Sequence, residues 1–388
     1  MSEVRVNNLS NENNTGGPTI SGITTYSGRH FFVPPVGDTA SRPSDCEPGS
    51  LRFNTDTTHL EYFRGNTIGW TEIEANLSEL GGGTSSSNKN ALGARALMGG
   101  GHVYIRTIEY FTVSNFGDTQ DFGDLTEAAG YSGGKGASTA TRGLFAGGYY
   151  KNAIEFVTIA STGNSTDFGD LTHPRLACSA NNDTVRAVFS GGQGPGHAVT
   201  NIMDYVTISS TGNALDFGDM GLAKTVRGSC SSSTRGFYNR ANNPATPVGV
   251  FESFAIRSLG NSTEFGDTLS FQQVFGGSSN ATRGIYCGGY LGNIIQYITM
   301  STSGDAVDFG DLINRGYNHT AANSTTRACF CFYNDYTNVP APSTLKVNVI
   351  QTVQIASTGD AVDFGDISYI TSENTQLPQG LSNEHGGI

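Results

Sequence analysis

A tandem repeat occupies most of this chain of 388 residues and limits the folds open to it. A Phe-Gly-Asp tripeptide closes each unit, with steps of 46, 49, 48, 44 and 55 residues, and an arginine near the start of each unit recurs with steps of 47, 44, 49, 48 and 44. Two independent markers therefore count the same six units, and a period of about 40 to 50 residues is typical of propellers and repeat arrays. The closing aspartates are Asp124, Asp170, Asp219, Asp267, Asp311 and Asp366, and the arginines are Arg95, Arg142, Arg186, Arg235, Arg283 and Arg327.

The pattern inside each unit is that of short β-strands. In the unit of Arg142, residues 143–148 are a short apolar run that ends in a glycine pair, and residues 154–160 are rich in aromatic and β-branched residues. A Ser-Thr-Gly-Asn turn follows, residues 166–171 return as a third strand, and a fourth precedes the next arginine. Because no segment of the repeats keeps a helical spacing of apolar residues, we predict an all-β fold with a six-bladed β-propeller of four strands per blade.

Composition divides the chain into five parts. Residues 1–25 are dominated by Asn, Ser, Thr and Gly and predict an extended arm, and residues 26–80 predict a small β module. Residues 81–90 read as a Gly/Ser linker, residues 91–371 as the propeller, and residues 372–388 as a C-terminal tail. A closed propeller needs strands from both ends of the repeat region, and we expect residues 91–95 and 367–372 to supply them.

The small module carries its own pattern. After a short aromatic strand at residues 29–33 and a loop from residue 37, residues 49–73 contain two alternating strands joined by a polar turn at residues 54–58. A second turn leads to a strand that bears Trp70, the only tryptophan. This pattern predicts a three-stranded meander.

Two repeated polar positions call for a structural role. An acid or amide recurs in the second strand of each unit, and a buried charge requires a partner, so we expect each repeat arginine to pair with it in its own or a neighbouring blade. In Phe-Gly-Asp we expect the glycine to reverse the chain and the aspartate carboxylate to accept backbone N–H groups. The acid or amide positions are Glu109, Glu155, Asp204, Glu252, Gln296 and Gln351.

The charge balance disfavours several partners. The net charge is −12, with 22 basic and 34 acidic residues and no basic patch, which argues against nucleic acid as a partner. No apolar run approaches the ~20 residues of a membrane span, and the start of the chain does not read as a signal peptide, so we expect synthesis in a host cytoplasm and no membrane insertion.

The cysteines and histidines predict no metal site. Cys287 and Cys331 lie four residues after a repeat arginine, where we expect a small core residue, and no His cluster accompanies the Cys329 and Cys331 pair. We expect surface or loop positions for the seven histidines and no cofactor. They are His30, His59, His102, His173, His197, His319 and His385.

The sequence contains no catalytic constellation that we can identify. It has no Gly-x-Ser-x-Gly elbow, phosphate-binding loop or His-Glu-x-x-His motif. A glycan-degrading propeller enzyme remains an alternative because such enzymes use carboxylate pairs and arginines, but the Ser-x-Asp-x-Gly-x-Thr-Trp box is missing. We therefore predict a protein without enzymatic activity and without catalytic residues.

Two stretches resemble proteins of bacteriophage particles. Residues 49–70, with Arg52, Asn54, Asp56 and Trp70, resemble a short β module common in phage tail fibres and other virion appendages, where it lies near an attachment or trimerising region. The phrase at residues 154–171 resembles the kelch-like repeats of fibre and structural proteins of marine phages. The resemblance implies a virion component.

The resemblance sets the functional expectation: a tail fibre or tail-tip protein, located in the virion, that binds a host surface glycan or receptor through its propeller. Its N-terminal part would bind other virion proteins and form a homo-oligomer, with a trimer favoured. The enlarged, proline-bearing loops at residues 241–249 and 334–347 depart from the repeat, and the candidate host contacts are Asn239, Arg240, Asn242 and Asn243. A capsid-decorating, head-fibre or tail structural protein is the alternative.

Overall fold

The chain divides near residue 76 into two compact units, each described here by itself. The expected arm, the aromatic strand at residues 29–33 and the expected linker lie outside the residues that the computed structural model describes. No helix in the described part is long and apolar enough to span a membrane. The described residues are 34–73, 94–101, 105–127, 134–226, 228–240, 249–269, 276–289, 292–314, 316–317, 320–331, 334–335, 345–346, 348–368 and 378–388.

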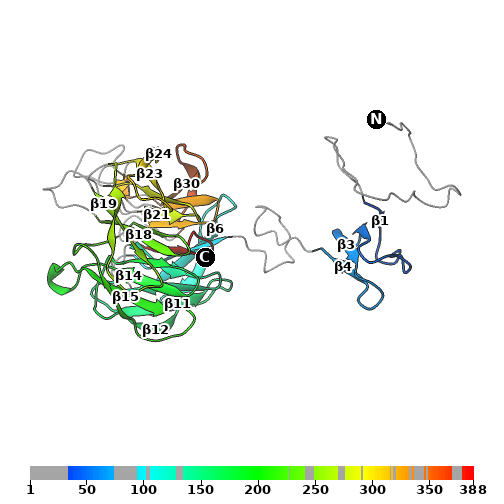
Figure 1. Ribbon diagram of the computed structural model, residues 1–388, viewed down its shortest axis with the longest axis horizontal. Coiled ribbons are helices and arrows are strands. Elements are labelled where there is room, and N and C mark those ends of the chain that lie inside the picture. The colour runs from blue at the N-terminus through cyan, green and yellow to red at the C-terminus, as the bar shows by residue number, and fades with distance from the viewer. Residues whose placement is uncertain are drawn as a thin grey trace. The chain divides into compact units, whose positions relative to one another are not determined.

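The larger unit consists of six four-stranded antiparallel sheets, which confirms the all-β class and the count of six units (Figure 1). This arrangement is consistent with the blades of a propeller. In order across each sheet, the strands of sheets 1 to 3 are β32 (Gln379–Ser382), β5 (Arg95–Gly99), β6 (Thr107–Thr112), β7 (Gln120–Asp124); β9 (Ala137–Ser138), β10 (Arg142–Ala146), β11 (Ala153–Thr158), β12 (Thr166–Asp170); β13 (Ser179–Asn182), β14 (Arg186–Ser190), β15 (Ile202–Thr207), β16 (Leu215–Asp219).

Sheets 4 to 6 repeat the same order, and short extra elements join the loops. Strand β8 (Gly134–Lys135) adds a parallel fifth strand beside β32, and a 3-10 turn covers Pro195–His197. A separate three-stranded sheet contains β25 (Gly316–Tyr317), β28 (Asn334–Asp335) and β29 (Leu345–Lys346). The strands of sheets 4 to 6 are β17 (Ser229–Ser231), β18 (Arg235–Arg240), β19 (Val250–Ala255), β20 (Thr263–Asp267); β21 (Gly276–Ser279), β22 (Arg283–Cys287), β23 (Ile294–Thr299), β24 (Val307–Asp311); β26 (Thr320–Asn323), β27 (Arg327–Cys331), β30 (Val349–Gln354), β31 (Val362–Asp366).

Each sheet begins one strand before its repeat arginine, and sheet 1 takes that strand from the C-terminus. Strand β32 pairs antiparallel with β5, with Leu381 opposite Leu97. The expectation that residues 367–372 supply this strand is wrong, and the tail expected from residue 372 is partly sheet. Residues 367–372 follow β31 too closely, because the chain must first cross three strand spacings of about 4.8 Å each to reach the first-strand position.

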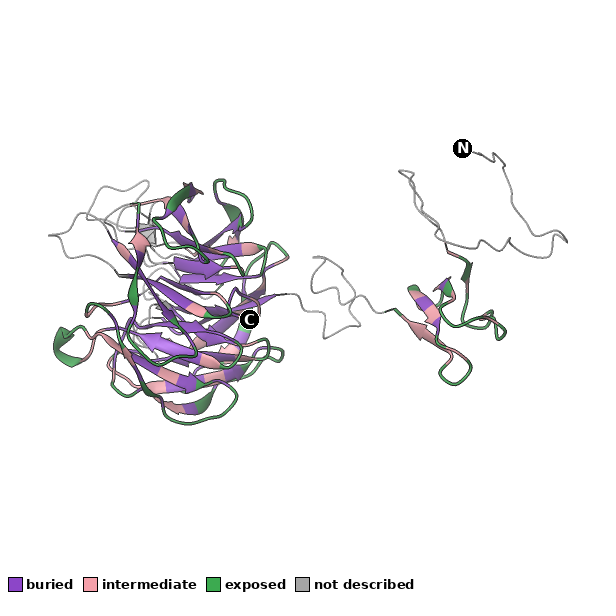
Figure 2. Cartoon of the chain, viewed as in Figure 1, coloured by how far each residue is buried: buried purple, intermediate pink, exposed green. Residues whose placement is uncertain are grey.

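The hydrophobic core lies between the sheets. One cluster joins Met98 and Phe111 of sheet 1 to Cys329 and Phe364 of sheet 6, and others join consecutive sheets in the same way. Figure 2 shows that the strands are mostly buried while the connecting loops are exposed. Cys287 and Cys331 are free, buried members of these clusters, which confirms their expected role as small core residues.

Phe-Gly-Asp lies inside the last strand of each sheet and does not reverse the chain, contrary to our expectation. The register shifts at this point in every sheet, as in a β-bulge, and Gly169 adopts a φ of 146°. A Cβ at Gly169 would lie 2.4 Å from the carbonyl oxygen of Gly212 in the next sheet. Glycine is required here because the neighbouring sheet approaches the backbone directly.

The N-terminal unit is a four-stranded sheet of β1 (Val36–Gly37), β2 (Leu51–Asn54), β3 (His59–Phe63) and β4 (Trp70–Glu72). The three expected strands and both turns are confirmed. Strand β1 is an addition, because it pairs parallel with β2 in a segment that we expected to be a loop.

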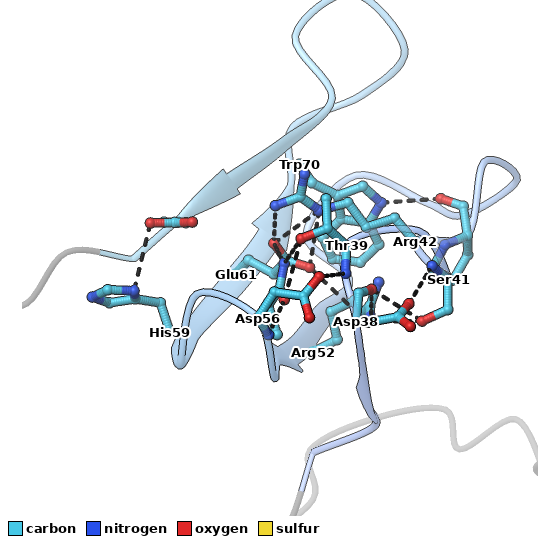
Figure 3. A network of polar contacts seen from close by, with 12 residues as sticks. Asp38, Thr39, Ser41, Arg42, Arg52, Asp56, His59, Glu61 and Trp70 are labelled. Atoms are coloured by element: carbon cyan, nitrogen blue, oxygen red, sulfur yellow. Dashed lines mark hydrogen bonds and ion pairs between the residues drawn. The ribbon is translucent and has the colours of Figure 1, made fainter.

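A buried carboxylate organises this small unit (Figure 3). Glu61 is fully buried and accepts hydrogen bonds from Arg42 Nη2 at 2.6 Å and Asn54 Nδ2 at 3.2 Å, with Arg52 Nε 3.5 Å away. Burial alone raises the pKa of Glu61, but the hydrogen bonds from Arg42 and Asn54 and the charges of Arg42 and Arg52 together lower it below its ordinary value. The Trp70 indole lies 5.7 Å from the Arg52 guanidinium and donates to the Pro43 carbonyl. The motif residues therefore specify the fold of the unit.

Removal of residues 379–388 should abolish the cooperative unfolding of the larger unit, because β5 loses its paired neighbour and exposes an edge and a core face. Thermal unfolding followed by circular dichroism measures this. Ser382→Ala, which keeps the strand, should cost only about 1 kcal/mol. Cooperative unfolding at the unchanged temperature after the deletion would contradict the role of β32.

Candidate functional site

The repeat arginines bind aromatic rings and main-chain carbonyls, so our prediction that they pair with the acids or amides of the second strand is wrong. The Arg142 guanidinium lies 4.4 Å from the ring centre of Phe156 and donates to the Ile208 carbonyl of the next sheet. No ion pair within the described residues joins a repeat arginine to the acids. Equivalent carbonyl bonds are Arg95 to Ile159, Arg186 to Ile256, Arg283 to Ile355 and Arg327 to Val113.

The sequence explains why the repeat arginines stack on aromatic rings and do not pair with the acids. The aromatic partner stands one residue after the acid or amide, as in Tyr110, Phe156, Tyr205 and Tyr297, on the same face as the arginine. A guanidinium on an aromatic face keeps a carbonyl partner and avoids the full desolvation of an ion pair. In sheet 4 Ser253 occupies this position and accepts a hydrogen bond from Arg235, whose guanidinium lies 5.2 Å from the ring centre of Phe237.

The acid or amide of the second strand links each sheet to the preceding one. Every one of these six side chains is buried and accepts the backbone N–H found two residues after the closing aspartate of the preceding sheet. The same bond links sheet 6 to sheet 1. The pairs are Thr126 to Glu155 (2.8 Å), Thr172 to Asp204 (3.1 Å), Gly221 to Glu252 (3.0 Å), Leu269 to Gln296 (2.9 Å), Ile313 to Gln351 (2.7 Å) and Ser368 to Glu109 (3.1 Å).

The charge at this position correlates with a second donor ten residues later. Where the residue is Glu, a hydroxyl of Thr119, Ser165 or Ser262 donates to the carboxylate. Where it is Gln, the later residue is Ala306 or Ala361. Asp204 instead receives Arg175, at 2.9 Å in a fully buried ion pair. A buried carboxylate needs more donors than an amide does, and each sheet supplies them accordingly.

Gln296→Glu should therefore destabilise the larger unit by about 2 kcal/mol at pH 7, because the new charge has one backbone donor and no hydroxyl. Adding Ala306→Ser should recover about 1 kcal/mol, although Ala306→Ser alone should not stabilise the protein. Denaturant unfolding of the four proteins of this double-mutant cycle gives the coupling. Additive effects would contradict the pairing of charge with hydroxyl.

The closing aspartates link the sheets through their main chain. The N–H of Asp170 donates to Asn213 Oδ1 in the next sheet at 3.0 Å, and the equivalent bond from Asp366 to Asp118 joins sheet 6 to sheet 1. No carboxylate bond of the six closing aspartates is found in the described part of the chain, so the expected role of these carboxylates is not supported. The acceptor is Asn164, Asn213 or Asn261 in three sheets and Asp305, Asp360 or Asp118 in the others.

The aspartate acceptors place like charges together. Burial, and then the charges of Asp360 and Asp308, raise the pKa of Asp311, and burial followed by Asp118 and Asp363 raises that of Asp366. A carboxyl with a raised folded-state pKa favours the folded state most below its unfolded pKa and loses that contribution as pH rises through the folded value.

Asp360→Asn and Asp118→Asn should each stabilise the protein at pH 7 by at most about 0.5 kcal/mol, because an asparagine accepts the same N–H without the repulsion. The gain should vanish near pH 3, because the raised pKa values of Asp311 and Asp366 leave these two carboxyls largely protonated there. Thermal midpoints across this pH range provide the measurement, with Asn213→Asp as the reverse variant. A gain that is equally large at pH 3 would show that repulsion is not its cause.

A circuit of small polar side chains joins the first strands of the six sheets. Asn182 Nδ2 donates to the Ser138 carbonyl, Asn182 N–H donates to Ser231 Oγ, and Ser231 N–H donates to Ser279 Oγ. Asn323 Nδ2 donates to the Ser279 carbonyl and its N–H to Ser382 Oγ, while Ser138 Oγ donates to the Ser382 carbonyl. Sequence reasoning missed this circuit. The signal was present, because five units carry Ser or Asn four residues before the repeat arginine, whereas the first has Ala91.

The last residues of the chain pack against these first strands. His385 is 2% exposed, which corrects its expected surface position, and Gly386 N–H donates to the Ser279 carbonyl. Gly387 N–H donates to His385 Nδ1, so His385 is neutral with its proton on Nε2, near the Ser138 carbonyl. Burial, with the charge of Lys135, lowers the pKa of His385 to about 3. Burial also lowers the pKa of Lys135 to about 8.

A cavity of about 580 Å³ lies where the C-terminus meets the hairpins between first and second strands. We call this end of the larger unit the turn face. Thr139, Thr184 and Thr325 line the cavity together with Arg142 and Ile388. The lining also includes Glu384, so it carries two charged side chains among uncharged ones.

The opposite end, which we call the loop face, carries an aromatic cluster. Tyr149 is exposed, and its ring centre lies 4.5 Å from that of Tyr150. The Tyr150 hydroxyl lies 3.4 Å from His197 Nδ1, and both residues hold left-handed φ values of 55° and 63°. Such values cost energy in residues other than glycine and are concentrated at functional sites. Lys151 pairs with Glu127 beside the cluster.

Buried contacts hold the loop of this cluster in place. Gly148 N–H donates to the Arg175 carbonyl at 3.2 Å, and Arg175 N–H donates to the Lys151 carbonyl at 3.0 Å. Arg175 is itself fixed by its buried pair with Asp204. The two tyrosines are therefore presented on a positioned loop, and sequence analysis did not single them out.

The candidate host contacts are only partly described. Asn239 lies in β18 and is 2% exposed, so it does not offer its side chain to an external partner, which corrects our expectation. As the fifth residue of a strand that packs between sheets, it occupies the small-residue position of Cys287 and Cys331. Arg240 ends β18, and its side chain, like Asn242 and Asn243, lies outside the described residues.

No family model matches the chain, and a search of curated proteins finds no match. Within the described residues, no group of three or more His, Cys, Asp or Glu side chains is arranged to hold a metal ion.

Proposed function

We propose that the six sheets close as a six-bladed, kelch-like propeller and that the chain is a non-enzymatic bacteriophage virion protein. In this proposal it is a tail fibre or tail-tip protein that binds a host surface glycan or receptor through the loop face. The N-terminal unit attaches it to other virion proteins and to sister copies. The observation that carries the host contact is the Tyr149 and Tyr150 pair beside His197.

Bonds between sheet 6 and sheet 1 support closure. The N–H of Ser368 donates to Glu109, Arg327 donates to the Val113 carbonyl, and a hydrophobic cluster spans the same two sheets. These are the contacts that consecutive sheets make elsewhere. In a closed ring every sheet packs between two neighbours, which leaves only short, protected edges and suits a protein displayed on a particle.

The loop-face cluster supports glycan recognition. Tyrosine rings offer flat apolar faces for the C–H groups of a sugar and hydroxyls for its oxygens, at low entropic cost because they have few rotatable bonds. The ion pair of Lys151 and Glu127 adds polar groups at the rim. Such a site binds weakly alone, and several copies on one particle raise its avidity by ~10² or more.

The buried acids support a non-enzymatic role. Each buried glutamate accepts a hydrogen bond from a backbone N–H of the preceding sheet and another from a side-chain hydroxyl. The carboxylate oxygens of Glu109, Glu155 and Glu252 are therefore engaged in hydrogen bonds that hold the sheets together. Repetition of the same bond around the sheets indicates a structural role that all sheets share.

Gold-labelled antibody against this chain, applied to particles of the phage that encodes it, tests the location. Label at the tail or its fibres supports the proposal, label over the head supports the capsid-decorating alternative, and intact particles without label overturn the virion assignment.

Tyr149→Ala combined with Tyr150→Ala should reduce binding of the purified protein to host cells at least tenfold without lowering its thermal midpoint by more than a few degrees. Flow cytometry of labelled protein on host cells measures the loss. Val362→Ala, at an exposed position on the last strand of sheet 6, is the matched control and should bind normally. Equal binding by the tyrosine variant would exclude this cluster as the contact.

A further inference from the structure

Strand β8 carries a lysine into the place where the first strands of several sheets meet. It pairs parallel with β32 of sheet 1 and also packs against β13, β21 and β26, the first strands of sheets 3, 5 and 6. Lys135 is the second residue of β8 and is 6% exposed. It stands opposite Gly380, and its N–H donates to Ser179 Oγ at 3.0 Å. The lysine side chain is therefore enclosed by segments that are far apart in the sequence.

This lysine departs from the repeat. It stands seven residues before the repeat arginine of sheet 2, and the residues at that spacing in sheets 3 to 6 carry no charge. The fold of the sheets consequently does not require a cation here, and a charge in one sheet alone indicates a role that the other sheets do not share. The equivalent residues are Ser179, Gly228, Gly276 and Thr320.

No group in the described part of the chain neutralises the Lys135 ammonium. None of the ion pairs found there involves this lysine, and no hydrogen bond from its Nζ is found there either. The ionisable groups that interact with its charge are Cys230 and His385. Burial raises the pKa of Cys230 to about 11, and His385 is neutral, so neither supplies a negative charge at pH 7.

A buried charge without a partner calls for a counter-ion, because desolvation is costly unless the charge is paired. The neighbouring hydroxyls do not supply one. Ser179 Oγ and Ser229 Oγ lie 2.6 Å apart, and Ser229 Oγ donates to the Ala180 carbonyl at 2.8 Å. With a pKa of about 8, Lys135 remains mostly protonated at pH 7. The site therefore holds a positive charge that the protein itself leaves uncompensated.

The surroundings limit the size of a counter-ion. A Cβ at Gly380 would lie 2.5 Å from the Ala321 carbonyl oxygen, and one at Gly277 would lie 2.3 Å from the Ser229 carbonyl oxygen. The first strands approach each other so closely at these points that a sugar or a phosphate has no room between them. Lys135 nevertheless keeps some exposure, so a water-sized sphere reaches it, and a halide ion is only slightly larger than water.

We propose that the larger unit binds one small inorganic anion, of the size of chloride, at the Lys135 ammonium. The ammonium offers three N–H donors and a full positive charge, which attracts an anion more strongly in an enclosed site than in water. A bound anion would let β8 remain packed among four sheets with its charge neutralised. The proposal concerns the purified chain and holds whether or not the protein belongs to a virion.

Thermal unfolding of the full chain, with sodium gluconate replaced stepwise by sodium chloride at constant ionic strength, tests the proposal. The comparison is with Lys135→Met, which keeps an apolar stem and removes the charge. Chloride should raise the thermal midpoint of the wild type by at least about 2 °C more than that of Lys135→Met, since a ligand that binds only the folded state stabilises it by mass action. Salt effects on the rest of the surface cancel in this difference.

The matched control is Lys224→Met, which removes a half-buried lysine elsewhere in the larger unit. It should keep the full response of the wild type to chloride. An equal response of the wild type and Lys135→Met would overturn the proposal, and so would a response that Lys224→Met abolishes while Lys135→Met retains it.

Bromide locates the ion directly and needs only the wild type, so this measurement remains decisive if Lys135→Met does not fold. Crystals of the full chain grown in sodium bromide should show an anomalous diffraction peak within hydrogen-bond reach of Lys135 Nζ. Peaks confined to surface lysines would mean adventitious ions only, and they would overturn the proposal, as would the absence of any peak.

Discussion

Hydrogen bonds between side chains of one sheet and the main chain of the preceding sheet are the interactions on which the larger unit depends. They occur at three positions in each sheet: a small polar residue on the first strand, a buried acid or amide on the third, and an Asn or Asp ahead of the last strand. Each of these bonds uses a backbone N–H or carbonyl group as one partner. The contacts between sheets are therefore kept although most surface residues differ from one repeat to the next. Buried polar groups that are fully satisfied specify one arrangement, since any slip would leave them unpaired.

The arginines illustrate how a correct pattern can lead to a wrong partner. The repeat placed an arginine and an acid in every unit, and opposite charges suggested ion pairs. In the structure, adjacent residues of one strand point to opposite faces, so the acid turns towards the preceding sheet while the aromatic residue beside it meets the arginine. Asp204 and Arg175 show that a buried ion pair does occur, but with an arginine outside the repeat.

The two units solve the problem of stability in opposite ways. The larger one buries apolar side chains between sheets and uses polar bonds to align them. The smaller one places the charged network of Glu61, Arg42 and Arg52 inside and leaves an apolar face outside. A buried network of this kind contributes specificity more than stability.

The sequence alone determined the all-β class, the count of six sheets, the three main strands of the N-terminal unit and the small buried cysteines, because periodicity and turn residues act over short distances. Only the tertiary structure decided which segment completes sheet 1, where the arginines bind, and that His385 and Asn239 are buried. Each of these depends on contacts between residues far apart in the chain, such as Ser138 with Ser382, whose pairing is set by the arrangement of the sheets. The positions of Tyr149, Tyr150 and His197 belong to the same class, since three residues on two loops become one site only when neighbouring sheets pack side by side.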